Sequence, residues 1–188
     1  TPHIISDTHP NTPESIKAGF DVLNIALQNN NLNVPHSYAA EYMMDDMFHQ
    51  KLRNKESLLK LCHNKILVEF SYIQRPDHVE NISFDMQIQG YEPILAHPER
   101  YVYYHDKWEY YYTHLKELGF ELQFNLLSLT PYYGKDVQRI AQKMLKAEMF
   151  DFACTDIHHL RHLEALNGSF TKASLADLFD KYHLRNNE

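Results

Sequence analysis

The feature that most constrains this chain is a regular alternation of short apolar runs with amphipathic segments of helical periodicity. The clearest runs cover residues 65–70, 94–96, 120–125 and 150–155. They recur at a spacing of about 30 residues, which is the length of one βαβ unit. Residues 65–70 are apolar almost throughout, as in a parallel strand that is buried on both faces. We therefore predict an α/β fold, either a closed parallel barrel or an open doubly wound sheet.

Helix start and stop signals lie between the apolar runs. Thr12 is a suitable N-cap with Pro13 at the first helical position, and Gly90 is a suitable residue to end a helix. A further strand is predicted over residues 34–42, finishing at Glu41. The predicted helices are one that starts at Thr12 and ends within 29–33, followed by 54–62, 80–89, 107–118, 135–147 and 169–183.

Size, charge and hydropathy exclude several classes of protein. With 188 residues and no linker or low-complexity tract, we expect one domain over residues 1–188. A net charge of −7 argues against a nucleic-acid partner. The chain has no apolar run of membrane-spanning length and no N-terminal signal, so we expect no membrane insertion and a cytoplasmic location. Five Gly without a glycine-rich phosphate loop argue against nucleotide binding.

Polar side chains follow the apolar runs. The run at 94–96 leads into His97, Pro98 stops the strand, and Arg100 comes two residues later. The carboxyl ends of parallel strands are where α/β folds carry their chemistry. Oxygen and imidazole donors without a thiolate suit Mn²⁺, iron, Zn²⁺ or Mg²⁺ better than a structural zinc site. The predicted metal ligands are His3, Glu41, Glu69, His97, Asp156 and His158.

Each of these residues also has a structural explanation. Glu41 is close to Asp45 and Asp46 and could belong to a solvated acidic patch. Asp156 could cap a helix, which is a common role for Asp after a strand. Glu69 is different, because a carboxylate inside an apolar strand costs several kcal/mol unless it binds a cation. Six such residues at consecutive strand ends favour the metal site.

Five segments carry a resemblance to a known family. They are Thr-Pro-His at 1–3, Glu-Tyr-Met-Met-Asp at 41–45, Val-Glu-Phe at 68–70, Ala-His-Pro-Glu-Arg-Tyr at 96–101 and Thr-Asp-Ile-His-His at 155–159. In this order they resemble the bacterial manganese-dependent protein tyrosine phosphatases of the polymerase-and-histidinol-phosphatase (PHP) superfamily. The resemblance implies a distorted (β/α)₇ TIM-like barrel with up to three divalent metals, Mn²⁺ foremost. It also implies a phosphotyrosine protein as substrate, a bacterial tyrosine kinase of capsule or exopolysaccharide synthesis in particular.

The resemblance further implies a role for each residue. Arg100 and Arg161 would hold the phosphoryl group, and Glu41 would bridge the first two metals. The other implied ligands are Asp156 for the first metal, Glu69 and His97 for the second, and His3 and His158 for the third.

The front of the sequence departs from the family pattern. The family's opening strand ends in His-x-His followed by Asp, and no such segment precedes Thr1. We therefore expect an N-terminally truncated barrel that lacks about one βα unit, ~30 to 40 residues, and full activity only from the intact protein.

Two alternatives to the phosphatase remain open. A thiol mechanism is not among them, because six residues separate Cys154 from Arg161 where cysteine phosphatases need five. The protein could instead be a small-molecule phosphoesterase of the same superfamily. It could also be a catalytically silent domain that binds phosphotyrosine or a kinase through Arg100 and Arg161. Whichever function holds, a cluster of tyrosines could form a peptide-binding surface or the contact surface of a homo-oligomer: Tyr103, Tyr104, Tyr110, Tyr111 and Tyr112.

Overall fold

The chain divides into two compact units in the computed structural model, which describes residues 1–186. The first unit comprises Thr1–Ser71 and Pro76–Pro93. The second comprises Tyr72–Arg75 together with the residues from Ile94 onward. A single domain over residues 1–188 stays a prediction, and its last two positions lie outside the described residues.

The first unit contains three parallel strands in chain order, β1 (His3–Ile4), β2 (Glu41–Met43) and β3 (Lys65–Glu69). The buried run at 65–70 therefore forms the predicted strand. The strand predicted over 34–42 is wrong in its bounds, because β2 begins at Glu41, where that strand was expected to finish. Pro35 has no N–H to donate to a neighbouring strand, and residues 33–40 are outside regular structure.

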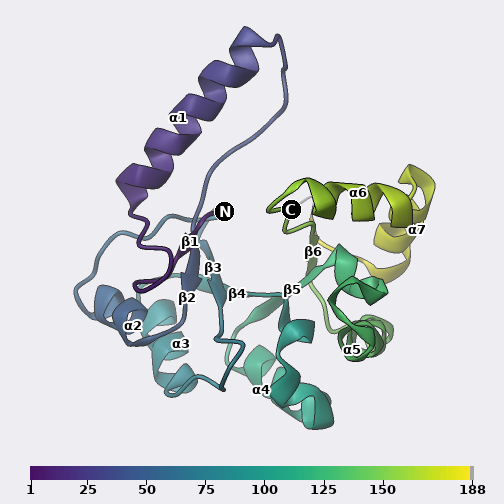
Figure 1. Ribbon diagram of the computed structural model, residues 1–188. Coiled ribbons are helices and arrows are strands. Elements are labelled where there is room, and N and C mark those ends of the chain that lie inside the picture. The colour runs from purple at the N-terminus through teal and green to yellow at the C-terminus, as the bar shows by residue number, and fades with distance from the viewer. Residues whose placement is uncertain (187–188) are drawn as a thin grey trace. The chain divides into compact units, whose positions relative to one another are not determined.

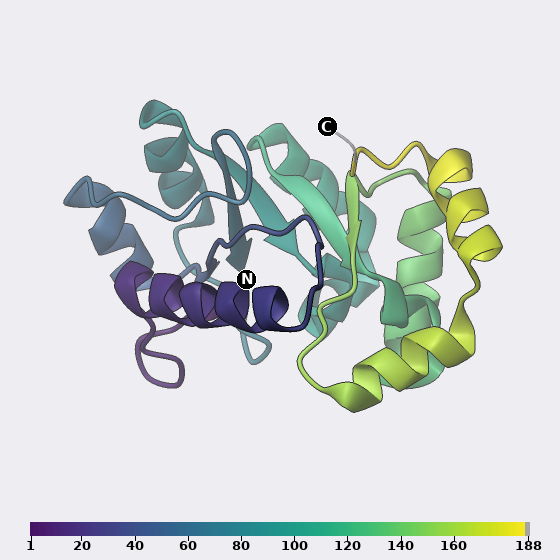
Figure 2. The ribbon, with the colours of Figure 1, turned by 90° about the horizontal axis from the view of Figure 1, so that it is seen from above.

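The helices of the first unit are α1 (Pro13–Asn29), α2 (Asp46–Arg53) and α3 (Val79–Ile88). Thr12 caps α1 as predicted, since its hydroxyl accepts from Ser15 N and the Ser15 hydroxyl accepts from Thr12 N. Figure 1 shows α1 running away from β1 and β2, and Figure 2 shows the segment after it returning along the helix. Phe20 contacts Tyr38 there, with ring centroids 4.8 Å apart.

The helix predicted over 54–62 is wrong. Asn54 ends α2 instead of starting a helix, because Asp45 already caps α2 by accepting from Phe48 N at 2.8 Å. Lys55 then takes a left-handed backbone (φ +55°), which ends the helical path. The chain that follows is held by Tyr42, whose hydroxyl accepts from Leu59 N at 2.8 Å.

The second unit also has three parallel strands in chain order, β4 (Glu92–Ala96, of which the residues from Ile94 belong to this unit), β5 (Glu121–Asn125) and β6 (Phe152–Cys154). Ala96 pairs with Gln123, and Asn125 pairs with Cys154. β4 ends at Ala96 and β5 ends at Asn125, and these are the positions where the predicted apolar runs 94–96 and 120–125 end. Short 3₁₀ turns follow at Pro98–Arg100 (η1), Val102–Lys107 (η2), Leu126–Leu129 (η3) and Pro131–Tyr133 (η4).

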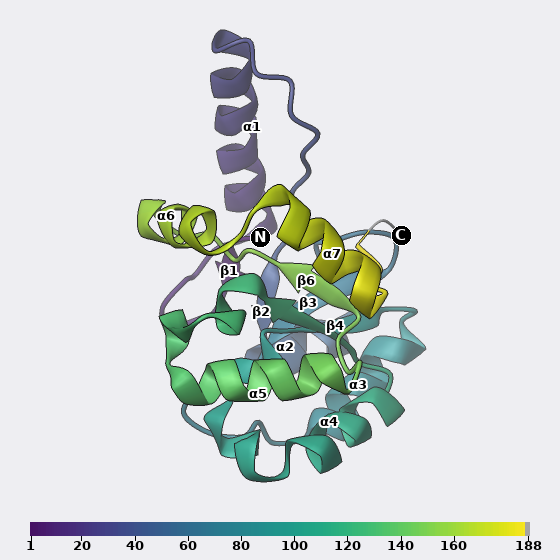
Figure 3. The same cartoon turned by 90° about the vertical axis from the view of Figure 1, so that its right-hand side faces the viewer.

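Four helices accompany these strands: α4 (Trp108–Glu117), α5 (Lys135–Lys146), α6 (Leu160–Ser169) and α7 (Lys172–Tyr182). Figure 3 shows α5 on one side of β5 and β6 and α7 on the other. The first two helices agree with the predicted 107–118 and 135–147. The helix predicted over 169–183 begins later, at Lys172, because Thr171 caps it, and α6 before it was not predicted.

The cores of both units consist of strand and helix side chains. Fully buried examples are Ile66, Val68 and Met86 in the first unit and Leu95, Leu122, Phe124 and Ile140 in the second. The predicted α/β class with parallel strands is confirmed. Within the described part of the chain, no helix has the length and apolarity needed to cross a membrane.

Candidate active site

Three of the predicted ligands converge in the first unit. His3, Glu41 and Glu69 lie on β1, β2 and β3, and His3 pairs directly with Glu41 in the register of the strands. One donor atom from each lies within 4.8 Å of the other two. His3 Nδ1 is 2.7 Å from Glu69 Oε1 and 4.0 Å from Glu41 Oε2. We call these three residues the His3 triad.

The donor set of the His3 triad fits a divalent cation. Glu41 and Glu69 are only 3% and 2% exposed, and burying carboxylates without compensation is costly. Donor atoms on two sides of one ion are separated by about 4 to 4.5 Å, since each bond is about 2.0–2.2 Å long. Two carboxylate oxygens with one imidazole nitrogen suit Mn²⁺, Fe²⁺, Zn²⁺ or Mg²⁺.

Two further predicted ligands follow strands of the second unit in strained backbone. His97 comes directly after β4 with φ +36°, and Asp156 comes shortly after β6 with φ +46°. A left-handed backbone costs a non-glycine residue about 1 kcal/mol or more. His97 is buried, and its N–H donates to Gln123 O at 2.7 Å. Such strain persists where surrounding contacts over-determine it, which is common at functional sites.

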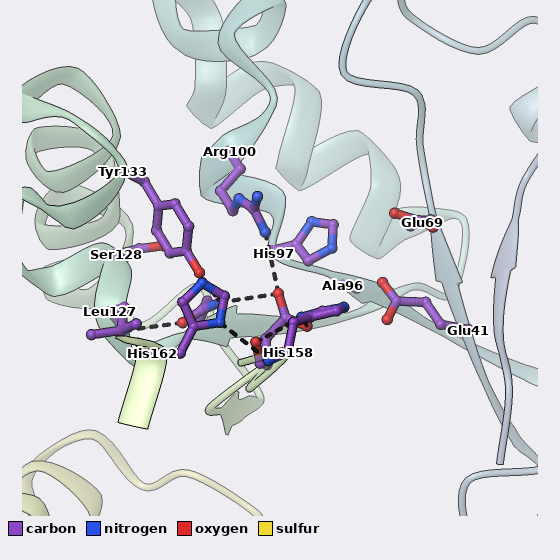
Figure 4. A network of polar contacts seen from close by, with 12 residues as sticks. Glu41, Glu69, Ala96, His97, Arg100, Leu127, Ser128, Tyr133, His158 and His162 are labelled. Carbon is purple, nitrogen blue, oxygen red and sulfur yellow. Dashed lines mark hydrogen bonds and ion pairs between the residues drawn. The ribbon is translucent and has the colours of Figure 1, made fainter. Parts of the chain in front are cut away.

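Arg100 is held on several sides within the second unit. Its Nη1 is 3.2 Å from Asp156 Oδ2. Figure 4 shows the side chain of Arg100 between those of Tyr133 and His97. The guanidinium also lies over two aromatic rings, with Cζ 4.3 Å from the centroid of Tyr133 and 4.9 Å from that of Tyr72. Burial opposes the charge of Arg100, but Tyr72, Tyr133 and Asp156 outweigh it and raise the pKa. Arg100 is therefore a fixed, permanently charged donor.

Asn125, at the end of β5, connects this network, and the sequence interpretation did not select it. The residue is fully buried, and its Nδ2 donates to Asp156 Oδ2 and to Tyr133 Oη, each at 3.2 Å. Its Oδ1 accepts from Leu127 N at 3.0 Å. Its place at a strand end was a signal that could have found it. We call Arg100, Asp156, Asn125 and Tyr133 the Arg100 network.

Glu99 fixes the turn that carries His97 and Arg100. It is fully buried, and its Oε1 accepts from Asn125 N (3.0 Å) and Ser128 Oγ (2.6 Å). Its Oε2 has no hydrogen-bond partner among the described residues, and burial raises the pKa of this carboxyl. The side chain thereby ties η1 to the start of η3.

Aromatic side chains support the same turn. Tyr101 is fully buried and donates to Ala96 O at 3.1 Å, while Tyr112 of α4 donates to Pro98 O. His105 Nε2 donates to Glu99 O at 2.9 Å. The turn at 97–100 is therefore a packed element and not an open surface loop.

The last two predicted residues are more exposed. His158 contacts Asp156, with its Nδ1 3.0 Å from the Asp156 carbonyl and 3.4 Å from Oδ1, and its side chain is 48% exposed. Arg161 is exposed in the first turn of α6, where it lines a surface hollow with His159 and Leu160. The structure thus brings His158 next to Asp156 and places Arg161 on a helix that the sequence did not predict.

Comparison with known proteins identifies the family. The family described as "Capsular polysaccharide synthesis, CpsB/CapC" matches residues 1–165. This chain belongs to the CpsB/CapC family. It is 29% identical over 162 residues to the tyrosine-protein phosphatase YwqE of Bacillus subtilis, covering 86% of this chain and 63% of that protein. It is 24% identical over 167 residues to CapC of Staphylococcus aureus, covering 85% of this chain and 62% of that protein.

A solved structure agrees with this CpsB/CapC assignment. It belongs to a study of YwqE from Bacillus subtilis and CpsB from Streptococcus pneumoniae, described as metal-dependent tyrosine phosphatases. The match has a TM-score of 0.76 at 26% identity and covers 97% of this chain and 77% of the solved one. The chain spans less than two thirds of the length of the curated relatives that it matches.

Proposed function

We propose that the protein is a metal-dependent protein tyrosine phosphatase. The observation that carries this proposal is the His3 triad, in which two buried carboxylates and an imidazole offer donor atoms within 4.8 Å of one another. Membership of the CpsB/CapC family and the likeness to YwqE, which is named as a tyrosine-protein phosphatase, support the same activity.

The proposed metal ligands are the six strand-end residues. In the first unit they are His3, Glu41 and Glu69, and in the second unit they are His97, Asp156 and His158. Mn²⁺ is the proposed ion, in up to three sites, and iron, Zn²⁺ or Mg²⁺ would fit the same donors. Such ions, when bound, lower the pKa of a coordinated water and neutralise charge on a phosphoryl group.

Arg100 is the proposed phosphate-binding residue. Guanidinium groups grip phosphate oxygens bidentately, and the contacts with Asp156 and Tyr133 fix its orientation before substrate binds. Arg161 is the proposed second phosphate-binding arginine. The leaving phenolate has a pKa near 10, so the reaction depends less on a general acid than hydrolysis of an alkyl phosphate does.

The proposed substrate is a phosphotyrosine protein, in particular a bacterial tyrosine kinase that controls capsular or exopolysaccharide synthesis. A cytoplasmic location is part of this proposal, because such a kinase draws its ATP from the cytoplasm. The distorted (β/α)₇ barrel implied by the sequence resemblance is likewise part of the proposal.

The test combines metal content with turnover. We expect the purified protein to retain Mn²⁺ and to hydrolyse p-nitrophenyl phosphate and a phosphotyrosine peptide. His97→Ala should abolish turnover, Arg100→Ala should chiefly raise KM, and His114→Ala on α4 should change neither. Wild-type rates for His97→Ala would refute the assignment.

Two other outcomes would favour the alternatives. Turnover of small phosphate esters without turnover of phosphotyrosine peptides would indicate a small-molecule phosphoesterase. Binding of phosphotyrosine without metal and without turnover would indicate a silent binding domain.

A further inference from the structure

Tyr72 lies beside Arg100, the proposed phosphate-binding arginine, and is not among the site residues that the sequence predicts. It belongs to Tyr72–Arg75, a segment outside helices and strands that groups with the second unit. In the chain the segment lies between β3 and α3. Its contacts with the turn at 97–101 join residues about 25 positions apart. These contacts hold Tyr72 against the turn that carries His97 and Arg100.

Three residues of the 97–101 turn pack against the ring of Tyr72. The guanidinium carbon of Arg100 lies 4.9 Å from its centroid. The imidazole of His97 stacks on it with centroids 5.5 Å apart and an interplanar angle of 24°, and Tyr72 Oη lies 3.3 Å from both nitrogens of that imidazole. Tyr101 completes the cluster at 5.7 Å. Tyr72 therefore has a defined position relative to Arg100.

Exposure distinguishes Tyr72 from its neighbours. It is 45% exposed, whereas His97 and Tyr101 are 2% and 0% exposed. The side chain of Arg100 is 21% exposed. A ligand that reaches Arg100 from solvent thus meets aromatic surface of Tyr72 next to it.

The geometry points to Tyr72 as a specificity-determining residue that contacts the aromatic ring of the substrate. This inference rests on the proposed function, because it takes Arg100 as the group that binds the phosphoryl oxygens. In an aryl phosphate a single oxygen separates phosphorus from the ring. A phosphoryl group on Arg100 therefore brings its own ring within reach of a tyrosine whose centroid is 4.9 Å from that guanidinium.

Aromatic contact of this kind selects aryl over alkyl phosphates. Ring pairs interact at centroid distances of about 4.5–7 Å in offset-stacked or edge-to-face arrangements. Their typical contribution corresponds to a preference on the order of three- to tenfold. A methyl or seryl phosphate gains nothing from Tyr72 beyond what Arg100 supplies.

The test compares binding of phenylphosphonate with binding of methylphosphonate, two non-hydrolysable ligands that differ in the ring. Dissociation constants are measured by calorimetry on the Mn²⁺-supplied protein and on three variants. Tyr72→Leu should weaken phenylphosphonate about three- to tenfold and leave methylphosphonate within about twofold. Tyr72→Phe should preserve both affinities, because it keeps the ring. Tyr110→Leu, at an exposed tyrosine of α4, is the matched control and should change neither.

Equal weakening of both phosphonates by Tyr72→Leu would overturn the inference, since Tyr72 would then merely support Arg100. Failure of wild type to prefer phenylphosphonate would overturn it as well. The proposed function is judged separately, by turnover of p-nitrophenyl phosphate in the wild-type protein. Preferential binding without turnover would therefore refute the phosphatase and leave Tyr72 as the residue that selects aryl groups.

Discussion

The His3 triad and the Arg100 network are built on opposite electrostatic principles. In the triad, two buried carboxylates approach one imidazole, so negative charge is concentrated on three neighbouring strands. In the network, a guanidinium contacts a carboxylate and an aromatic ring, and a buried amide donates hydrogen bonds to both of these partners. The first arrangement is suited to a cation and the second to an anion. Metal-assisted hydrolysis of a phosphate ester requires both kinds of group.

The largest expected effect comes from the triad. Glu69→Gln keeps the shape of the side chain and removes its charge, so we expect Mn²⁺ affinity and turnover to fall on the order of 100-fold or more, beyond the usual effect of residues that only orient ligands. Asp77→Asn, at an exposed carboxylate outside the triad, is the matched control. Metal analysis and calorimetry provide the measurement. Unchanged Mn²⁺ content in Glu69→Gln would show that the charge of Glu69 is not needed for metal binding. The contrast between a cation-binding triad and an anion-binding network would then fail.

A smaller effect, on stability, should come from the centre of the network. Asn125→Asp is nearly isosteric but places a carboxylate at a fully buried position, 3.2 Å from Asp156 Oδ2. Loss of the donated hydrogen bond and repulsion between like charges should lower the free energy of unfolding by about 3 kcal/mol. The same change at an exposed position of α5, Gln142→Glu, should stay within about 0.5 kcal/mol.

Urea unfolding at pH 7 measures both variants. Equal stability of Asn125→Asp and wild type would show that the amide of Asn125 does not hold Asp156 in solution. It would also mean that the Arg100 network is looser than its contacts indicate.

The smallest effect concerns the tyrosine beneath the 97–100 turn. Tyr112→Phe removes the hydrogen bond to Pro98 O and should cost about 1 kcal/mol at pH 7. Burial raises the pKa of Tyr112 well above its ordinary value in the folded protein. Its contribution is therefore complete below the unfolded pKa of about 10 and is lost as pH rises from there toward the folded pKa.

Unfolding free energies between pH 8 and 11 test this dependence. The wild type should lose stability more steeply than Tyr112→Phe above pH 10, by about 1.4 kcal/mol per pH unit. Parallel pH curves for the two proteins would show that Tyr112 ionises freely in the folded state.

The two regions also differ in how far the sequence predicts them. The triad residues were selected because each stands in a strand or at its end, and apolar runs such as 65–70 are recognised from local pattern alone. The Arg100 network depends on contacts over long chain distances, since Arg100 and Asp156 are 56 positions apart and Glu99 and Asn125 are 26 apart. No local periodicity encodes these contacts. The structural roles of Asn125, Glu99 and Tyr72 can therefore be recognised only in the folded structure.

The wrong prediction of a helix at Asn54 likewise arises because tertiary packing, and not the local sequence, decides the outcome. Asn54 has the chemistry of an N-cap, but Asp45 begins a helix earlier and leaves Asn54 at its end. Asp45 and Asn54 are both suitable N-cap residues, but among the described residues the only helix that either of them bounds is α2, which lies between them. The outcome depends on the packing of Phe48 and Leu52, which are buried in α2, and short windows of sequence do not reveal that packing.

The left-handed backbone at His97 and Asp156 has a consequence for how this protein evolves. Glycine is the residue that such backbone favours, so a mutation to glycine at either position would relieve strain of about 1 kcal/mol. The same mutation would delete an imidazole or a carboxylate. Selection for greater folding stability therefore favours glycine at these two positions, whereas selection for the proposed metal binding favours the imidazole and the carboxylate. A lineage no longer selected for the proposed phosphatase activity would be expected to acquire glycine at these positions early.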